Sequence, residues 1–172
     1  MYNTRDKNTQ SETILKYLTF SLGIEEYGIP VLQVLEIIKI NKLIEVPHAK
    51  KYFLGLMDVR GHVVPVIDLK TKLGIFYSED EDLDEAGKHE DEEDEFGDRA
   101  IIIKAFGKRV GLAVDKVSHV HNFNTNSIDV GPASMKNASS RYITGVGKIK
   151  DNFVILLDLE NLFTEGEILN LL

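Results

Sequence analysis

An internal repeat constrains the fold of this chain more than any other feature of its sequence. Two stretches share one spacing of apolar residues and glycine at an offset of 83: Tyr27-Gly28-Ile29-x-Val31-x-x-Val34-x-x-Ile37 and Val110-Gly111-Leu112-x-Val114-x-x-Val117-x-x-Val120. Further along, residues 52–56 (YFLGL) match 142–146 (YITGV) and residues 63–69 (VVPVIDL) match 153–159 (FVILLDL), at an offset of 90. The period is too long for a solenoid. The repeat therefore predicts two small, pseudo-equivalent units that derive from one duplicated unit.

The local pattern predicts that these units are built mainly from β-strands. Residues 17–22 (YLTFSL) alternate and are rich in strand formers. Near-continuous apolar runs of strand length follow at 63–67, 100–103 and 153–157. Residues 31–40 fit either a helical turn or a strand, and Thr164-x-x-Glu167 has the spacing of a capping box for a short helix that reaches Leu172. Short strands without long intervening helices indicate a mainly β barrel or sandwich.

Composition excludes several classes of protein and site. The 172 residues contain no cysteine, so disulfides, thiol nucleophiles, Cys-ligated zinc and iron–sulfur clusters are excluded. No apolar run approaches the roughly 18 residues that a membrane span needs. The opening stretch, MYNTRDKNTQSET, has no hydrophobic segment of the kind a secretory signal requires. We expect a cytoplasmic protein without membrane insertion, whose residues 1–13 form a disordered tail.

The negative charge of the chain is concentrated in one stretch. Residues 79–98 contain 13 Asp or Glu and one Lys, a net charge of -12, and since the whole chain carries -8 the other 152 residues carry +4. Repulsion between like charges and the shortage of apolar residues predict a disordered, solvated loop. A site for a hard divalent cation is a second interpretation, although the EF-hand spacing is missing. A loop that covers a basic face and weakens binding there is a third.

Chemical motifs are weak throughout the sequence. His119-x-His121 would place two imidazoles on one strand face, but two ligands make a poor metal site and a surface pair is the preferred interpretation. Asp68 and Asp158 follow apolar runs at equivalent places of the repeat, which favours duplicated caps or turns over paired catalytic carboxylates. No Ser–His–Asp order or nucleophile motif is present. We therefore predict no catalytic residue, no metal, no cofactor and no enzymatic activity.

Six motifs follow one another along both halves: residues 18–23 (LTFSLG), 26–29 (EYGI), 55–61 (GLMDVRG), 63–69 (VVPVIDL), 111–117 (GLAVDKV) and 142–146 (YITGV). Together they resemble CheW, the family of chemotaxis coupling proteins, and the similarity runs from about Lys16 to Phe163. The resemblance implies two pseudo-equivalent five-stranded SH3-like β-barrels that share a core, with short helices. It places a single domain at 14–172, a first barrel at about 24–76 and a second at about 99–158. The strand at 16–22 is a candidate for sharing between them.

The same resemblance implies function and partners. CheW-like proteins are non-enzymatic adaptors that join the histidine kinase CheA, through its regulatory domain, to the cytoplasmic hairpin of methyl-accepting chemoreceptors. This implies a cytoplasmic protein at membrane-associated receptor arrays, monomeric alone and assembling into rings with the kinase. The positions that match the kinase-binding face are Gly55, Leu56, Val59, Arg60 and Gly61. Those that match receptor-binding positions are Val34, Glu36, Ile37, Arg60, Ile101 and Val120.

Individual residues of this set also admit a purely structural role. The resemblance implies that Glu36 pairs with Arg60, as an interface-shaping salt bridge, as a direct partner contact, or as both. Val34, Ile37 and Val120 fit a barrel core as well as a binding surface, and Gly55 fits a backbone conformation that only glycine tolerates. Two departures stand out: Asp58 replaces the family's usual Asn, and the acidic stretch is longer than usual.

Two alternative functions stay open on the sequence. The net charge of +4 outside the acidic stretch and the scattered aromatic residues fit a β-barrel that binds single-stranded nucleic acid. Against this, the basic residues form no stripe, and the acidic loop would repel phosphate. The other alternative is a CheW-like domain that pairs only with the kinase.

Overall fold

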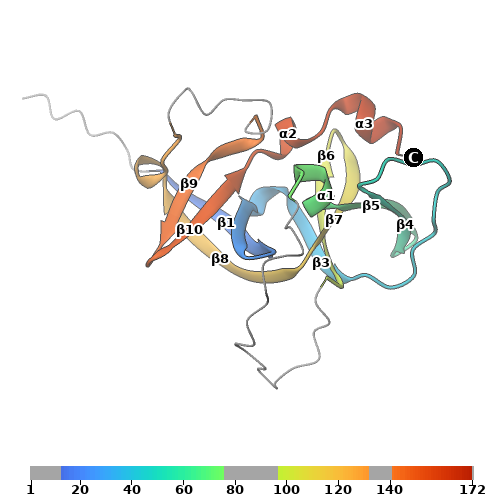
Figure 1. Ribbon diagram of the computed structural model, residues 1–172, viewed down its shortest axis with the longest axis horizontal. Helices are drawn as coiled ribbons and strands as arrows, with labels where there is room; N and C mark the ends of the chain where they lie inside the picture. The colour runs from blue at the N-terminus through green and yellow to red at the C-terminus, as the bar shows by residue number, and fades with distance from the viewer. Residues whose placement is uncertain (1–12, 76–96, 132–140, 172) are drawn as a thin grey trace, which may run out of the picture.

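Two five-stranded sheets contain more than half of the residues that the structure describes (Figure 1). The structure is a computed structural model, and it describes residues 13–75, 97–131 and 141–171. The predicted tail at 1–13 and acidic loop at 79–98 therefore lie outside the described residues, apart from Thr13, Gly97 and Asp98. Sheet A has the order β8 (Lys116–Asn124), β1 (Ile14–Leu22), β2 (Glu25–Pro30), β10 (Asn152–Leu157) and β9 (Ile143–Ile149). Sheet B has the order β3 (Val34–Lys39), β6 (Arg99–Ala105), β7 (Lys108–Val114), β5 (His62–Asp68) and β4 (Phe53–Val59). The prediction of a mainly β chain with two pseudo-equivalent five-stranded units is confirmed.

The strands of the two repeats are exchanged between the sheets. At the offsets of the sequence repeat, β1 to β5 correspond to β6 to β10, and this substitution turns the strand order of sheet A into that of sheet B. Each sheet thus takes two strands from one repeat and three from the other. The two repeats meet at a parallel pair, β2 with β10 or β7 with β5, and at an antiparallel pair, β1 with β8 or β6 with β3. This differs from the predicted ranges of 24–76 and 99–158, because β2 lies in sheet A, and β6 and β7 in sheet B. The chain changes sheets over η1 (Val31–Gln33) after β2 and over the single residue Asp115 after β7.

Three apolar clusters fill the molecule, and the largest is shared by both sheets. It joins residues of sheet A such as Phe20 and Ile29 to residues of sheet B such as Ile103 and Leu112, all of them fully buried. A second cluster lies within sheet B and receives side chains from all five of its strands. A third, around Tyr17 and Phe123, lies within sheet A. The prediction of a core common to the two units is therefore confirmed.

Short helices close the ends of the strands. Asp68 and Asp158 accept backbone N–H bonds as the N-caps of α1 (Leu69–Leu73) and α2 (Leu159–Leu162), as the sequence predicts. Thr164 and Glu167 form the predicted capping box of α3 (Glu165–Leu169), which is shorter than the predicted span. Residues 31–40 contain both alternatives, a 3-10 turn followed by β3, and a further 3-10 turn, η2 (Thr125–Ser127), follows β8. No helix in the described part of the chain is long and apolar enough to cross a membrane.

Candidate functional site

An ion pair joins opposite edges of sheet B. Glu36 lies on the edge strand β3, at a bulge in its pairing with β6. Arg60 lies in the two-residue turn between β4 and β5, with a φ of 54°, and the φ of Gly61 is 82°. The Arg60 Nη2 atom lies 3.2 Å from Glu36 Oε2. Because β3 and the β4–β5 hairpin are at opposite ends of the strand order, this contact requires that the sheet curl as a barrel does.

Asp58 supports the turn that presents Arg60. Its Oδ1 atom accepts the backbone N–H of Gly61 at 2.7 Å. An Asn side chain offers the same kind of acceptor, so the departure from the family pattern at this position keeps the turn. The Arg60 side chain is 80% exposed and that of Glu36 is 23% exposed. An ion pair this exposed contributes at most about 1 kcal/mol to stability. Because most of the Arg60 side chain is exposed, its guanidinium is accessible to a partner.

Two apolar side chains on the edge strands face the space between the sheets. Ile37 on β3 is paired with Ile101, and Val120 on β8 is paired with Leu18. Directly opposed residues point to the same side of a sheet, and Ile101 and Leu18 belong to the shared core. Ile37 is nevertheless 43% exposed and Val120 52% exposed. They form an outward continuation of the shared core, on strands from different repeats.

The other predicted receptor-binding residues lie deeper. Val34 is half-buried and packs against the shared core. Ile101 is fully buried beneath Ile37, so its side chain supports the surface from within and is not part of it. The sequence could not distinguish a buried side chain that supports the surface from an exposed one that forms it. The pattern of apolar residues in the repeat shows which positions are equivalent, but it does not show which of them face solvent.

The predicted kinase-binding residues lie on the edge strand β4 and its turn. Leu56 exchanges two backbone hydrogen bonds, of 2.8 and 2.9 Å, with Ile44 in the preceding segment. A Cβ atom on Gly55 would lie 2.6 Å from the carbonyl oxygen of Ile44, and the φ of Gly55 is 144°, so this position needs glycine. Leu56 is half-buried, and Val59 is 4% exposed and packs inside sheet B.

The exposed apolar residues near these positions were not singled out from the sequence. They are Leu54 on β4, Val63 on β5 and Ile44, at 37%, 58% and 60% exposure. Val63 begins an apolar run whose later members are buried, and nothing in that run indicates where burial starts.

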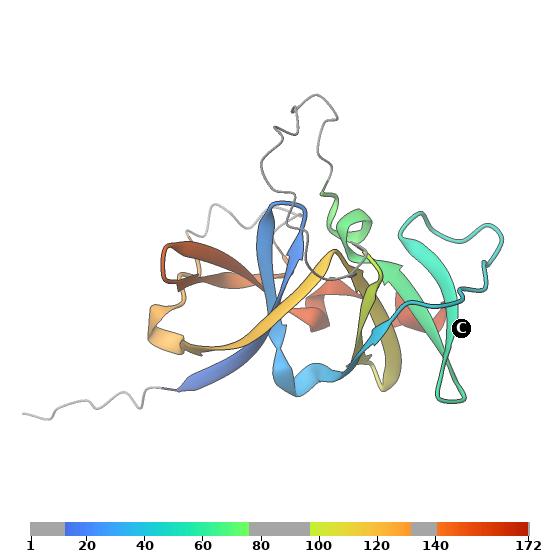
Figure 2. The same cartoon turned by 90° about the horizontal axis from the view of Figure 1, so that it is seen from below.

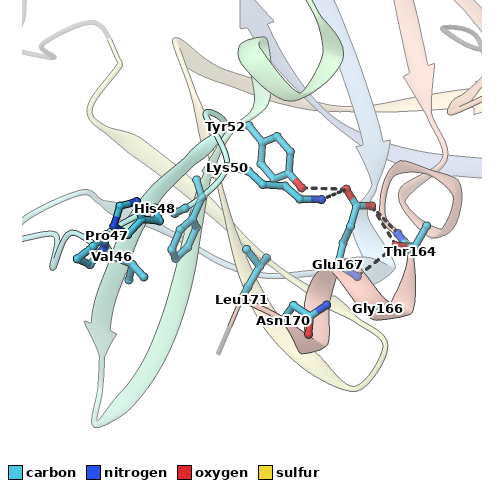
Figure 3. A pocket seen from close by; sticks show the side chains of 12 residues that line it. Val46, Pro47, His48, Lys50, Tyr52, Thr164, Gly166, Glu167, Asn170 and Leu171 are labelled. Carbon is cyan, nitrogen blue, oxygen red and sulfur yellow. Dashed lines mark hydrogen bonds and ion pairs between the residues drawn. The ribbon is translucent and has the colours of Figure 1, made fainter.

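A second cluster, also missed by sequence reasoning, joins α3 to α1 and to the segment before β4 (Figure 3). Glu167 Oε1 accepts hydrogen bonds from Tyr52 Oη at 2.8 Å and from Lys72 Nζ at 2.7 Å, and Lys50 Nζ lies 3.7 Å away. The Lys72 ammonium also lies 4.6 Å from the centre of the Tyr52 ring. Burial raises the pKa of Glu167, but hydrogen bonds from Lys72, from the Thr164 amide and from Tyr52 outweigh it and hold the pKa at about 2. A carboxylate with so low a pKa is a weak base near neutral pH.

This cluster forms one wall of a hollow of about 520 Å³ between residues 46–53 and the C-terminal helix. The opposite wall consists of Val46, Pro47 and His48 (Figure 3). Within the described part of the chain, no group of three His, Cys, Asp or Glu side chains is placed to hold a metal ion. The rings of His119 and His121 lie 6.3 Å apart on β8.

The described residues therefore offer surfaces for binding: two exposed sheet edges, the apolar residues along them and an ion pair at the end of one sheet. Fold and site together define a β-sheet binding scaffold of two fused repeats. A scan of protein families matches the CheW-like domain to residues 16–167. The chain belongs to the CheW-like family.

Individual proteins give the same result. The chain is 31% identical to the chemotaxis protein CheW of Klebsiella aerogenes over 156 residues, which cover 88% of this chain and 83% of that protein. It is 28% identical to CheW of Helicobacter pylori, over 91% of this chain and 86% of that one. Among solved structures, the scaffolding protein TtCheW of Thermoanaerobacter tengcongensis superimposes with a TM-score of 0.72 at 28% identity, over 91% of this chain and 97% of that one.

Proposed function

We propose that this chain is a non-enzymatic chemotaxis adaptor that couples methyl-accepting chemoreceptors to the histidine kinase CheA. The observation that carries the proposal is the pairing of Arg60 with Glu36 next to half-exposed apolar side chains on the edge strands. Membership of the CheW-like family supports it, and relatives that bear the name chemotaxis protein CheW agree with it. The comparisons do not favour the nucleic-acid alternative. The proposed place of action is the cytoplasmic side of receptor arrays.

The receptor face of this proposal is the outward continuation of the shared core. A helical hairpin that docks on a protein surface needs apolar anchors there, and Ile37 and Val120 offer them from two strands. Each is roughly half exposed, so its complete burial would contribute about 1 kcal/mol. Val34 would contact the partner only at its exposed part, and Ile101 would hold Ile37 in place from below.

The kinase face of this proposal is the β4–β5 hairpin. Gly55, Leu56 and Gly61 shape its backbone, and Val59 holds it to the inner cluster of sheet B. Arg60 stands at the end of this hairpin and reaches Glu36 on the receptor side. The ion pair thus connects the two faces, which gives receptor state a route to kinase geometry through one scaffold. Ring assembly with the kinase, and a monomeric state alone, belong to the same proposal.

Calorimetric titration tests the two faces separately. The full chain is titrated with the regulatory domain of CheA and with a receptor cytoplasmic hairpin fragment. Val120→Asp is expected to abolish receptor binding and leave kinase binding intact, whereas Arg60→Ala weakens both. Lys150→Ala is the matched control, since Lys150 is the repeat equivalent of Arg60 and has a φ of 53° in the β9–β10 turn. Absence of binding heat with both partners would refute the proposal. Kinase binding without receptor binding would leave a domain that pairs with the kinase alone.

A further inference from the structure

The end of the β6–β7 hairpin carries three cations that form no ion pair with a carboxylate of the described residues. Lys104 and Arg109 are directly opposed across the two strands, Lys108 faces Ala105, and all three cations are exposed. Like charges opposed in this way destabilise a sheet. Among the described residues, no acidic side chain forms an ion pair with any of the three. Phe106, in the turn, has a φ of 48° and is 44% exposed.

The other repeat shows that this charge is not needed to build such a hairpin. The corresponding β1–β2 hairpin has Glu25 and Glu26 at the positions of Lys108 and Arg109, and Ser21 at that of Lys104. The sign of the charge is therefore reversed between two ends that share one backbone pattern. The reversal points to a role outside the fold.

The β1–β2 end is also closed by a carboxylate that the β6–β7 end lacks. Asp115 accepts the backbone N–H of Gly23 at 2.6 Å and lies 3.0 Å from Lys70 Nζ. Its repeat equivalent is Leu32, which is 99% exposed and contributes no such group. The β6–β7 end thus has no carboxylate at the position of Asp115 and no acidic residue on its two strands, and the carboxylate that lines the neighbouring hollow is that of Glu160 in α2.

The β6–β7 hairpin and η1 lie side by side at this open end (Figure 2). A hollow of about 250 Å³ is lined there by residues of the hairpin, η1 and α2. Its lining includes Lys104 and Phe106 on one side, Gln33 on another and Glu160 from α2. The Oε1 atom of Gln33 is buried and has no hydrogen-bond partner. A buried acceptor without a donor is costly, and a ligand with N–H groups would remove that cost.

We propose that the β6–β7 end, defined by Lys104, Phe106, Lys108 and Arg109 with Leu32 beside it, binds an acid-rich peptide segment of a partner protein. Carboxylates of the peptide pair with Lys104, Lys108 and Arg109. They supply the negative charge that Asp115 supplies at the β1–β2 end. An apolar side chain of the peptide contacts Phe106 and Leu32, and a backbone N–H reaches Gln33 Oε1. Glu160 in the wall of the hollow keeps the acidic side chains of the peptide on the strand side. A peptide fits better than a flat anionic surface, because the hollow and the buried acceptor both require a ligand that enters.

The test uses the full chain and a fluorescein-labelled peptide in which glutamates flank one phenylalanine, followed by fluorescence anisotropy. The double variant Lys108→Glu, Arg109→Glu is expected to bind the peptide at least about tenfold more weakly, since two attractive contacts become repulsive. Lys148→Glu, Lys150→Glu is the matched control, with the same change of net charge on another hairpin, and binding should stay within about twofold. Leu32→Ser, which alters no charge, should weaken binding a few-fold. Circular dichroism confirms that each variant is folded.

Several results would overturn the proposal. Equal losses in the two double variants would show that only net charge matters. Single-stranded DNA or phosphatidylserine vesicles that bind in preference to the peptide, and that lose binding in Lys108→Glu, Arg109→Glu, would assign the β6–β7 end to another ligand. Peptide binding that arises only after deletion of residues 79–95 would make the chain's own acidic stretch the occupant. The variant Lys108→Glu, Arg109→Glu is also titrated with the CheA regulatory domain. Neither the kinase face nor the receptor face includes Lys108 or Arg109, so this titration distinguishes failure of the peptide proposal from failure of the adaptor proposal.

Discussion

The carboxylate of Glu167 offers a direct test of what holds α3 to α1 and to the segment before β4. We consider Glu167→Gln, which keeps the size of the side chain and the capping-box pattern of Thr164-x-x-Glu/Gln. The substitution removes the negative charge that accepts hydrogen bonds from Tyr52 and Lys72 at 2.8 and 2.7 Å. The Lys72 side chain is only 9% exposed, so without Glu167 its ammonium loses the partner that makes its burial tolerable.

The size of the effect follows from the pKa of Glu167. The folded chain holds this pKa at about 2, against an ordinary value of 4.5. A tenfold change in proton affinity corresponds to about 1.4 kcal/mol, so the full difference would amount to about 3 kcal/mol. Since the carboxylate borders an open hollow, solvent screens part of this. We expect Glu167→Gln to lower the free energy of unfolding by about 2 kcal/mol at neutral pH.

The effect must also depend on pH in one direction. Because the pKa is lower in the folded chain than in the unfolded chain, the stabilisation is fully present above about pH 4.5 and is lost as the pH falls through about 2. The difference in unfolding free energy between wild type and variant should therefore shrink over that window.

Urea unfolding followed by circular dichroism, at several pH values, measures this difference. Glu165→Gln is the control: Glu165 is an exposed carboxylate in the same helix, and we expect its loss to cost no more than about 0.5 kcal/mol. A Glu167→Gln effect below about 0.5 kcal/mol at neutral pH, or one that does not change towards pH 2, would refute the reasoning.

Three further predictions concern single positions. Gly55→Ala should lower the free energy of unfolding by about 2–3 kcal/mol in urea unfolding, because the added Cβ would lie 2.6 Å from the Ile44 oxygen; a neutral result would contradict that contact. Gly166→Ala should raise the midpoint of thermal unfolding and contribute about 0.5–1 kcal/mol, since nothing lies within 4 Å of its Cβ position in α3; destabilisation would mean that the position is not helical. Arg60→Ala should cost less than about 1 kcal/mol in urea unfolding while it weakens partner binding, and a loss above about 2 kcal/mol would make Arg60 a structural residue.

Much of the fold could be predicted from the sequence, because equivalent positions of the repeat have equivalent places in the core. The offset of 83 aligns Leu18 with Ile101, and both prove to be core residues opposite exposed positions of edge strands. The caps at Asp68 and Asp158 were predictable for the same reason, since each cap needs a side-chain oxygen at a helix start. The exchange of strands was not predictable, because the two sheet changes depend on the three residues of η1 and on the single residue Asp115, and segments this short have no periodicity of their own.

The candidate site divides in a similar way. The contact of Glu36 with Arg60 was expected from family resemblance, and the ion pair is present at 3.2 Å. The cluster around Glu167 was not expected, since its hydrogen-bond partners Lys72 and Tyr52 lie 95 and 115 residues away in the sequence. Pairing over such distances leaves no local pattern, whereas the capping box at Thr164 is local and was found.

The exchange of strands has a consequence for how such a chain could have arisen. A lone ancestral copy of the repeat would have supplied only part of each sheet, so it would have needed a second copy to complete both, as a strand-swapped homodimer does. In a homodimer every mutation appears twice, and its two ends must stay chemically identical. Fusion of the copies into one chain removes that constraint. Glu25 and Glu26 at one end and Lys108 and Arg109 at the other are an instance of the resulting freedom. A fusion of this kind would turn a symmetric body into one able to present different chemistry to different neighbours.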